Sequence, residues 1–221
     1  MLSSETQIIV LSGIRHPMRT ILTVLLIGLG ASFINAPQAA SDESSGWTDL
    51  LGRDLKNWAR LESGPNPWRL TSQHSLICSA KVVDYYTPDR NFENGTIRFE
   101  YRLTSTAAKS GYRGAVYVRR TQESKGVRVD LGDDCGTIAT PVASGTDRVK
   151  TITEKPSVKL AKRVGEWNDV EISMAGRAIS VKVNGKPAST FEQCDILSGL
   201  IVFAGEGSEI EFRSVLWKAG K

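Results

Sequence analysis

Three aspartates lie close together in the stretch "VDLGDDCG", at the end of an expected strand and in the turn after it. Asp130 falls on the polar face of that strand, where the hydrogen bonding of a turn does not explain it. Asp133 and Asp134 fall in the turn, where aspartate side chains commonly accept hydrogen bonds from their own backbone. Converging carboxylates can also take a proton from a substrate, bind a sugar hydroxyl or hold a Ca²⁺ ion. The pattern leaves both a turn role and a functional role open for this cluster.

Two arginines, Arg119 and Arg120, end the neighbouring expected strand "GAVYVRR". A guanidinium group is planar and offers several donors, so it can pair with carboxylates or bind an anionic or hydroxylated ligand. The five tryptophans of the chain add flat surfaces on which sugar rings can stack. Most tryptophans of a β-sandwich belong to its core, and we expect at most two of these to be exposed.

Other common catalytic signatures are missing from the sequence. There is no G-x-S-x-G elbow, Walker loop, H-E-x-x-H helix or Rossmann glycine pattern. His74 is the only histidine after the N-terminal segment, and its polar neighbours "TSQHS" are typical of a solvated loop. Cys78, Cys135 and Cys194 form no C-x-x-C pair, and buried free thiols are favoured over a disulfide. We expect no cofactor, while a Ca²⁺ ion stays open.

Strand patterns account for most of the chain after residue 45. Apolar and charged residues alternate in "NGTIRFEYRLT", and "KGVRVDL", "GLIVFAGEG" and "SEIEFRSV" indicate further strands. Helical periodicity is weak, and turn residues separate the strands. The pattern predicts an all-β fold in which two antiparallel sheets form a sandwich. In the last strand the alternation changes phase after Ser214, so Val215 and Trp217 can face the core only past a bulge.

The stretch "GEWNDVEISMAGRAISVKVNG" predicts a β-hairpin, because apolar and polar residues alternate twice and the Asn184-Gly185 pair favours a chain reversal. We expect Trp167 to pack over a sheet edge and Asn168 to satisfy backbone groups where the strand begins. Residues 140–164 show only a short strand signal, near Val149–Ile152. We expect a long loop there, and such loops of a sandwich often carry binding groups.

Residues 1–41 differ in composition from the rest of the chain. Arg15 and Arg19 precede an apolar run, "ILTVLLIGLG", and small residues follow in "NAPQAAS", which is the order found in a secretory signal peptide. The apolar run is shorter than the roughly 20 residues of a membrane span, although an N-terminal anchor stays open. We expect a secreted or periplasmic protein of the bacterial cell envelope, with no membrane contact beyond this leader.

The charge pattern bears on nucleic-acid binding. The formal net charge of +4 is spread along the sequence, and acidic residues are interleaved with basic ones in the expected strands. A nucleic-acid partner usually requires a concentrated basic stripe. We therefore expect no nucleic-acid partner, and we interpret the charge as serving solubility.

The order of the motifs resembles the 3-keto-disaccharide hydrolase domain family. The motifs run from "GWTDLLGRDLKNW" through "YRGAVYVRR" and "VRVDLGDDCGTIA" to "GEWND", the Asn184-Gly185 turn and the closing "EFR". The resemblance covers residues 46–218 and implies a concanavalin A-like jelly roll whose partner is a carbohydrate or glycoside. The chain departs from the family pattern in three places: it has Tyr112-Arg113-Gly114 where Asn-Ser-Gly is common, Arg128 and Asp130 where Glu and Gln are common, and no histidine before the last strand.

The resemblance implies an exported protein that hydrolyses or eliminates the glycosidic bond of 3-keto-disaccharides or related glycosides. A ketone at C3 acidifies the hydrogen at C2, which a carboxylate can remove before the glycosidic bond breaks. Asp130 or Asp133 is then the base, and Arg119 stabilises the enolate oxygen. Substrate binding is assigned to four further residues, namely Tyr117, Arg128, Asp134 and Trp167.

Two other functions stay open from the sequence alone. A non-catalytic, lectin-like module would hold a glycan through tryptophan and arginine, and the missing histidine and the presence of Arg128 favour it. A structural or interaction domain of the envelope is the third alternative. Catalysis would be favoured if the aspartate cluster, Arg119 and Trp167 converged in one pocket, whereas their scatter over both faces of the sandwich would weigh against it.

Overall fold

Two antiparallel β-sheets make up the fold, and the all-β prediction is confirmed. The computed structural model describes residues 46–79, 83–106, 111, 113–143 and 149–220. These residues form fifteen strands and no α-helix, so no helix long and apolar enough to cross a membrane occurs among them. The expected leader, residues 1–41, lies outside the described residues.

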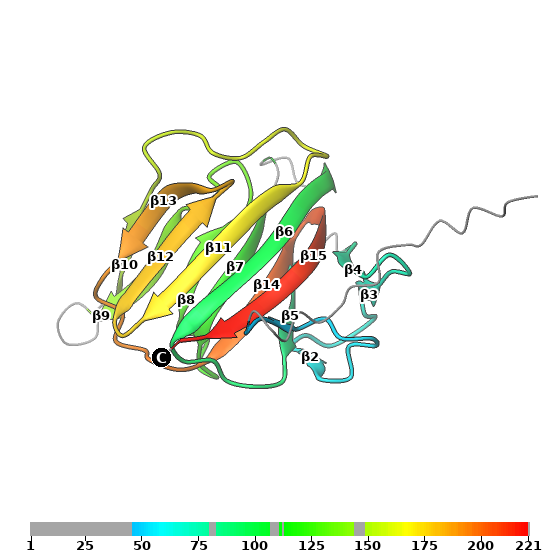
Figure 1. Cartoon of the computed structure of the whole chain (residues 1–221), viewed down its shortest axis with the longest axis horizontal. Coiled ribbons are helices and arrows are strands. Elements are labelled where there is room, and N and C mark those ends of the chain that lie inside the picture. Colours follow the sequence, from blue (N-terminus) through cyan, green and yellow to red (C-terminus); the bar gives the residue numbers. More distant parts are fainter. Residues whose placement is uncertain (1–45, 80–82, 107–110, 112, 144–148, 221) are drawn as a thin grey trace, which may run out of the picture. The chain divides into compact units, whose positions relative to one another are not determined.

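The first sheet has eight strands (Figure 1). Seven of them follow the order β13 (Lys186–Phe191), β12 (Ala178–Val183), β11 (Asn168–Ala175), β6 (Gly95–Thr106), β15 (Ser208–Ala219), β4 (Ser75–Cys78) and β3 (Trp68–Leu70). The short strand β1 (Thr48–Asp49) pairs with β15. Buried and half-buried residues alternate along β11, which means that this sheet packs one face on the core and turns the other outward.

The second sheet has seven strands and lies against the first (Figure 1). Its order is β10 (Val149–Glu154), β9 (Ile138–Ala143), β8 (Val127–Asp130), β7 (Gly114–Arg120), β14 (Leu200–Glu206), β5 (Val83–Pro88) and β2 (Trp58–Arg60). Every pairing in both sheets is antiparallel. Strands β8, β7 and β14 occupy the middle of the sheet.

Aromatic side chains join the two sheets in the core. Phe99 of the first sheet meets Phe203 of the second edge to face, with ring centroids 5.7 Å apart. Phe203 also meets Phe212 edge to face, at 5.0 Å. Burial of each such side chain stabilises the fold by about 1.5–3 kcal/mol. The sandwich is therefore held by apolar contacts between the sheets, which leaves the outer faces available for polar groups.

Residues 140–164, which were expected to form a long loop, contribute to a β-hairpin as well as to a loop. Strands β9 and β10 pair along their whole length, from Val149 opposite Ala143 to Glu154 opposite Ile138. The short strand signal near Val149–Ile152 falls in β10. Because β10 is an edge strand and most of its described side chains are exposed, its apolar alternation is weak. The remaining loop, residues 155–167, links β10 of the second sheet to β11 of the first (Figure 1).

The bulge expected in the last strand is confirmed. The register of β15 against β6 shifts between Arg213 and Leu216, and Ser214 takes a positive φ of 51°. Val215 and Trp217 are consequently buried. The extra residue restores the inward phase, so the final part of β15 also covers the core.

All three cysteines are buried. Cys135 and Cys194 are free thiols, and the Cys194 thiol donates a hydrogen bond to the carbonyl oxygen of Ile196 at 3.2 Å. Cys135 lies beside the hydroxyl of Tyr101, and burial raises the pKa of the Cys135 thiol to about 12. The prediction of buried free thiols is confirmed for these two residues.

Candidate functional site

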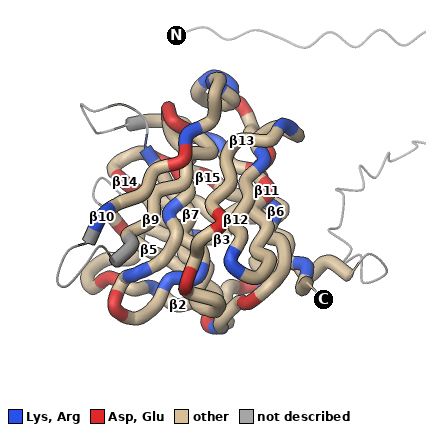
Figure 2. Tube along the Cα trace, turned by 90° about the vertical axis from the view of Figure 1, so that its left-hand side faces the viewer, with Lys and Arg blue, Asp and Glu red and all other residues tan. Residues whose placement is uncertain are grey.

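Polar side chains gather on the outer face of the second sheet, where β8, β7, β14 and β5 lie side by side. The register places Tyr117 of β7 opposite Arg128 of β8, and Ala115 opposite Asp130. Ala115 is short and completely buried, which means that longer side chains around it cover it. Charges of both signs are interspersed along the chain trace in Figure 2. The outer face of this sheet is thus a polar layer over small side chains.

Arg128 lies at the centre of this layer. Its Nε and Nη2 groups donate to Oδ1 of Asp130, at 2.8 Å for Nε. Its Nη1 group donates to the Tyr117 hydroxyl at 2.8 Å and to Oε1 of Glu206. Nη2 also donates to Oε2 of Glu206, at 2.7 Å. Because a guanidinium has five N–H groups and all five are engaged, Arg128 positions two carboxylates and has no donor left for a ligand.

The carboxylate of Asp130 is held on one side only. Arg128 bonds Oδ1, and none of the described residues donates to Oδ2. Burial raises the pKa of Asp130 above its ordinary value; the charge of Arg128 opposes this shift, and the charges of Glu206 and Asp134 reinforce it. A carboxylate with a raised pKa and an available oxygen is suited to accept a proton from a substrate.

A pocket of about 290 Å³ opens beside Asp130. Asp133, Asp134, Arg113 and Arg128 also line it, so the structure brings the predicted aspartate cluster together. The side chains of Asp133 and Asp134 are 65% and 66% exposed, whereas that of Asp130 is 24% exposed. Asp130 is therefore the most shielded of the three carboxylates.

Arg119, which the sequence assigned to catalysis, does not reach this face. A regular strand would place it beside Tyr117, but Arg119 has a positive φ of 53° and the pairing of β7 with β14 shifts at this point. Its side chain is completely buried. Nη1 donates to the carbonyl oxygens of Gly176 and Ile196 at 2.7 and 3.1 Å. Arg119 therefore braces loops inside the fold and is not part of the pocket.

The bulge turns Arg120 toward the outer face instead. Its guanidinium lies 4.5 Å from the ring centroid of Tyr85 and 5.5 Å from that of Tyr117. The guanidinium of Arg128 lies 5.6 Å from the same Tyr117 ring. Tyr117 therefore contacts two cations, of which Arg128 is already engaged by two carboxylates and by the Tyr117 hydroxyl.

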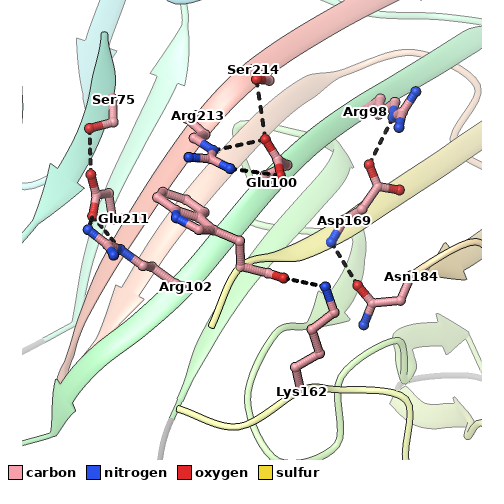
Figure 3. A network of polar contacts seen from close by, with 11 residues as sticks. Ser75, Arg98, Glu100, Arg102, Lys162, Asp169, Asn184, Glu211, Arg213 and Ser214 are labelled. Carbon is pink, nitrogen blue, oxygen red and sulfur yellow. Dashed lines mark hydrogen bonds and ion pairs between the residues drawn. The ribbon is translucent and has the colours of Figure 1, made fainter. Parts of the chain in front are cut away.

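Trp167, which the sequence assigned to substrate binding, belongs to the other sheet. Its ring centroid lies 3.9 Å from the guanidinium of Arg213 and 4.7 Å from that of Arg102. Figure 3 shows these two arginines in a network of ion pairs with Glu100 and Glu211 on the first sheet. Trp167 thus packs against the first sheet, whereas Asp130 lies on the second, and the structure does not bring them into one pocket.

Asn168 takes the structural role expected from the sequence. Its Oδ1 accepts hydrogen bonds from the backbone N–H of Lys162 at 2.8 Å and from Nδ2 of Asn184 at 3.0 Å. Oδ1 of Asn184 in turn accepts from the backbone N–H of Asp169 at 3.0 Å. The two asparagines therefore tie the beginning of β11 to the hairpin turn, and this prediction is confirmed.

Residues 46–218 match the model of one protein family, the 3-keto-alpha-glucoside-1,2-lyase-like domain. The chain belongs to this family. The match spans the same residues as the family resemblance that was inferred from the sequence motifs. That resemblance is therefore confirmed. A search of curated proteins finds no match.

Three solved structures share the fold. A candidate glycosyl hydrolase from Parabacteroides distasonis ATCC 8503 aligns with a TM-score of 0.63 and 16% identity, over 83% of this chain and 98% of its own. The carbohydrate binding module CBM66 from Bacillus subtilis aligns at 0.56 and 10%, over 74% and 96%. The Bacillus licheniformis β-glucanase aligns at 0.51 and 10%, over 79% and 97%. At these identities the likeness shows the fold alone, and it confirms the concanavalin-like jelly roll.

Within this family fold, three residues of the site were not assigned from the sequence: Tyr85, Arg113 and Glu206. Glu206 ends the apolar run "LIVFAGE", which indicated only a central strand. An acid directly after a buried strand was the available signal, because such a residue comes to lie at the strand's end. Its role becomes visible only once β14 is known to lie beside β7.

The described residues contain no group of three or more His, Cys, Asp or Glu side chains arranged to hold a metal ion. Asp133 and Asp134, which the sequence left open as Ca²⁺ ligands, approach the ammonium groups of Lys159 and Lys155 at 3.8 and 3.6 Å. These contacts are exposed, so they are weak and strongly screened by salt.

Proposed function

We propose that this protein is an exported enzyme that breaks the glycosidic bond of a 3-keto glycoside at the pocket beside Asp130. The observation that carries the proposal is the carboxylate of Asp130, which Arg128 holds through Oδ1 while no described residue donates to Oδ2. Membership of a family described as 3-keto-alpha-glucoside-1,2-lyase-like supports the reaction class.

The proposed reaction is an elimination. The ionised carboxylate of Asp130 takes the proton from C2, which the neighbouring ketone at C3 has made acidic. The electron pair of that C–H bond moves first into an enolate whose negative charge lies on the C3 oxygen. It then forms the C1–C2 double bond as the bond from C1 to the glycosidic oxygen breaks, and Asp130 afterwards returns its proton to the hydroxide left by the protonation of the leaving group. The departing oxygen takes a proton from water, so that an alcohol and an unsaturated keto sugar are released. Addition of water to the double bond would complete a net hydrolysis.

The enolate that forms at the C3 oxygen needs a nearby positive group. Arg119 cannot supply it, because its side chain is buried and bonded to backbone carbonyl groups. Arg113 lines the same pocket as Asp130 and is exposed. In this proposal Arg113 stabilises the developing charge, as preorganised donors do in other enolate-forming sites.

A non-catalytic carbohydrate-binding module is the second candidate function. The displacement of Arg119 and Trp167 from the site favours it, because two residues that the catalytic interpretation used are elsewhere. The rings of Tyr85 and Tyr117 on the same face offer the aromatic contacts that sugar binding commonly uses. The likeness in fold to a carbohydrate binding module is compatible with this function.

The two functions are distinguished by incubating the purified protein with 3-keto-disaccharides and with the parent disaccharides, while following both sugar release and binding. Release from the keto sugars alone supports the elimination, whereas binding without release supports the module. The variant Asp130→Asn should lose release by about 100-fold or more while it still binds, since one general base is removed. Arg98→Gln, on the other sheet, is the matched control. Full activity of Asp130→Asn would exclude this base.

Export is a separate proposal that rests on residues 1–41. The protein is secreted or periplasmic if this leader is a cleaved signal peptide, with the cut near Ala40. N-terminal sequencing of the protein recovered from the cell envelope tests it. A chain that still begins at the first residues would contradict cleavage.

A further inference from the structure

A second cavity, of about 80 Å³, adjoins the pocket beside Asp130. Its walls come from β6, from the aspartate turn and from the loop of residues 155–167, which links the two sheets (Figure 1). Gly132 and Asp133 line both the pocket and this cavity. The two hollows are therefore neighbours, and a ligand held beside Asp130 can extend past the aspartate turn into the second one.

The floor of this cavity is apolar. Its apolar lining consists of Tyr101, Leu103, Leu131, Ala161 and Val164. The first three are buried, whereas Val164 is 46% exposed although its side chain is apolar. A ligand group that covers Val164 would remove this apolar surface from water, which is favourable.

The polar groups at the floor are already used within the fold. Oδ1 of Asn168 accepts hydrogen bonds from the backbone N–H of Lys162 and from Nδ2 of Asn184. The hydroxyl of Tyr101 forms a hydrogen bond with the thiol of Cys135. A sugar ring carries several hydroxyl groups, and burying a hydroxyl without a partner is unfavourable. The floor therefore suits an aryl or alkyl group better than a second sugar.

The rim of the cavity is cationic. Lys159, Lys162 and Arg163 line it, and all three are exposed. Lys162 is used by the fold, since its Nζ donates to the carbonyl oxygen of Trp167 at 2.9 Å (Figure 3). Lys159 approaches the carboxylate of Asp133 only to 3.8 Å, and its side chain is 68% exposed. The guanidinium of Arg163 bonds none of the described residues, where only its backbone N–H is engaged. Lys159 and Arg163 are thus accessible cations beside a cavity.

The charges of the lining favour an anion. Three cations line the cavity, against the single carboxylate of Asp133. Lys159 faces that carboxylate and offsets it, so the remaining charge is positive. A planar guanidinium such as that of Arg163 binds a carboxylate well, because two parallel N–H groups match its two oxygens.

We infer that this cavity binds the leaving group of the substrate, and that the leaving group is an aryl or alkyl acid, not a second sugar. Its apolar body lies against Val164 and Leu131, and its carboxylate binds Lys159 and Arg163. The inference rests on the proposed function, since it names the substrate class for the adjoining pocket. It assigns Val164, Lys159 and Arg163 as the residues that determine specificity.

Three probes test the inference. The 3-keto-α-glucoside of 4-(hydroxymethyl)benzoate is compared with the matching carboxamide, which lacks the charge; the methylene group keeps the two glycosidic bonds similar in reactivity. The third probe is a 3-keto-disaccharide whose leaving group is glucose. Preference is measured as a ratio of kcat/KM, or of Kd if the protein binds without turnover. We expect the acid to be preferred at least tenfold over each of the others, and its preference over the carboxamide to shrink as salt is added.

Variants at exposed positions of the loop locate the effect without disturbing the core. The double variant Lys159→Gln/Arg163→Gln should abolish the preference for the acid over the carboxamide while it leaves use of the carboxamide unchanged. Val164→Ser should weaken use of both benzyl probes by a similar factor of at least threefold. Lys155→Gln and Val158→Ser are the matched controls, because both residues belong to the same loop, are 63% and 61% exposed, and do not line the cavity.

The outcomes separate this inference from the proposed function. Equal use of acid and carboxamide by the wild type, or better use of the disaccharide, overturns the inference and leaves the proposed function standing. A preference that survives in the double variant, or that is lost equally in the controls, also overturns it, because the acid would be recognised elsewhere. A protein that neither cleaves nor binds any of the three probes overturns the proposed function together with the inference.

Discussion

Arg128 of β8 reaches over β7 and bonds both carboxylate oxygens of Glu206 on β14. The two residues are 78 positions apart in the sequence, and their strands are not neighbours. Their side chains are 21% and 10% exposed, so the pair is largely shielded from water. Because Arg128 also bonds Asp130, the position of the proposed base depends on an acid at the end of a different strand.

Glu206→Gln should destabilise the protein. The change leaves a half-buried guanidinium with one carboxylate partner fewer, and we expect the free energy of unfolding to fall by about 1–3 kcal/mol. Urea denaturation measures it. Glu171→Gln is the control, because its partner Lys182 is 53% exposed and the loss should stay below about 1 kcal/mol. Equal losses in the two variants would contradict the central role of the Arg128 pair.

The activity should depend on pH through Asp130. The base must be ionised, and its pKa is raised by burial, so kcat/KM should fall on acidification at a higher pH than an ordinary aspartate would produce. The charge of Glu206 is among the causes of that raised pKa. Glu206→Gln should therefore move the acid limb of the profile to lower pH. A limb that stays in place or moves upward would show that another group is titrating.

Alkaline solution should destabilise the fold through Cys135. Its pKa is raised by burial from the ordinary 9.0 to about 12, so its contribution to stability is complete below pH 9 and is lost as pH rises through 12. The full loss is on the order of 4 kcal/mol. Burial also raises the pKa of Tyr101, which acts in the same direction. Unfolding midpoints at pH 8 and pH 11 should differ less in Cys135→Ala than in the wild type, and an unchanged difference would exclude this thiol.

Arg119→Lys should weaken the fold and leave the site intact. A single ammonium cannot reach the carbonyl groups of Gly176 and Ile196 together with the side chain of Asn94, which Arg119 bonds at 2.7, 3.1 and 3.3 Å. Loss of these buried hydrogen bonds should lower the free energy of unfolding by about 1–3 kcal/mol. Binding and kcat/KM should stay within about twofold of the wild type, because Arg119 is outside the pocket. A stable variant that loses turnover selectively would show that Arg119 takes part in catalysis.

Gly199→Ala should also destabilise the fold, because Gly199 packs against the bulge. A Cβ at this position would lie 2.5 Å from the carbonyl carbon of Arg119 and 2.8 Å from its oxygen. Backbone atoms cannot move aside cheaply, so we expect a loss of about 1–3 kcal/mol in a thermal or urea melt. Gly52→Ala has only backbone strain to overcome, since nothing lies within 4 Å, and should lose about 1 kcal/mol. Wild-type stability of Gly199→Ala would mean that the bulge is not held by this contact.

The strands with one buried face could be predicted along their length, whereas only part of the edge strand could. β6 and β11 alternate apolar and polar residues because each has one face in the core. This two-residue period can be recognised directly from the residue types. β10 pairs with a neighbour through its backbone while most of its described side chains are exposed. Backbone pairing leaves little mark on residue types, so the sequence showed only a short strand signal, near Val149–Ile152, within an expected long loop.

Some residues of the candidate site could likewise be predicted from the sequence, and others could not. Asp130, Asp133 and Asp134 are close in the sequence, and the turn that joins them keeps them close in the structure. Arg119 and Arg120 were both considered as partners of the aspartates or of a ligand, and Arg119 was assigned to catalysis, but the structure places Arg119 in the interior. Regular alternation would have placed Arg119 outward, and only the bulge in β7 reverses it.

By itself, the sequence determined the family, the sandwich of alternating strands and the aspartate turn beside Arg128, because these depend on side chains within a few residues of one another. The tertiary structure turned Arg120 and not Arg119 to the outer face of the second sheet, brought Glu206 over β7 to Arg128, and placed Trp167 against the opposite sheet. Each of these depends on contacts between strands distant in sequence, such as the approach of Gly199 to the backbone of Arg119. Local periodicity carries no information about such contacts, since it records the face of a strand and not its neighbours.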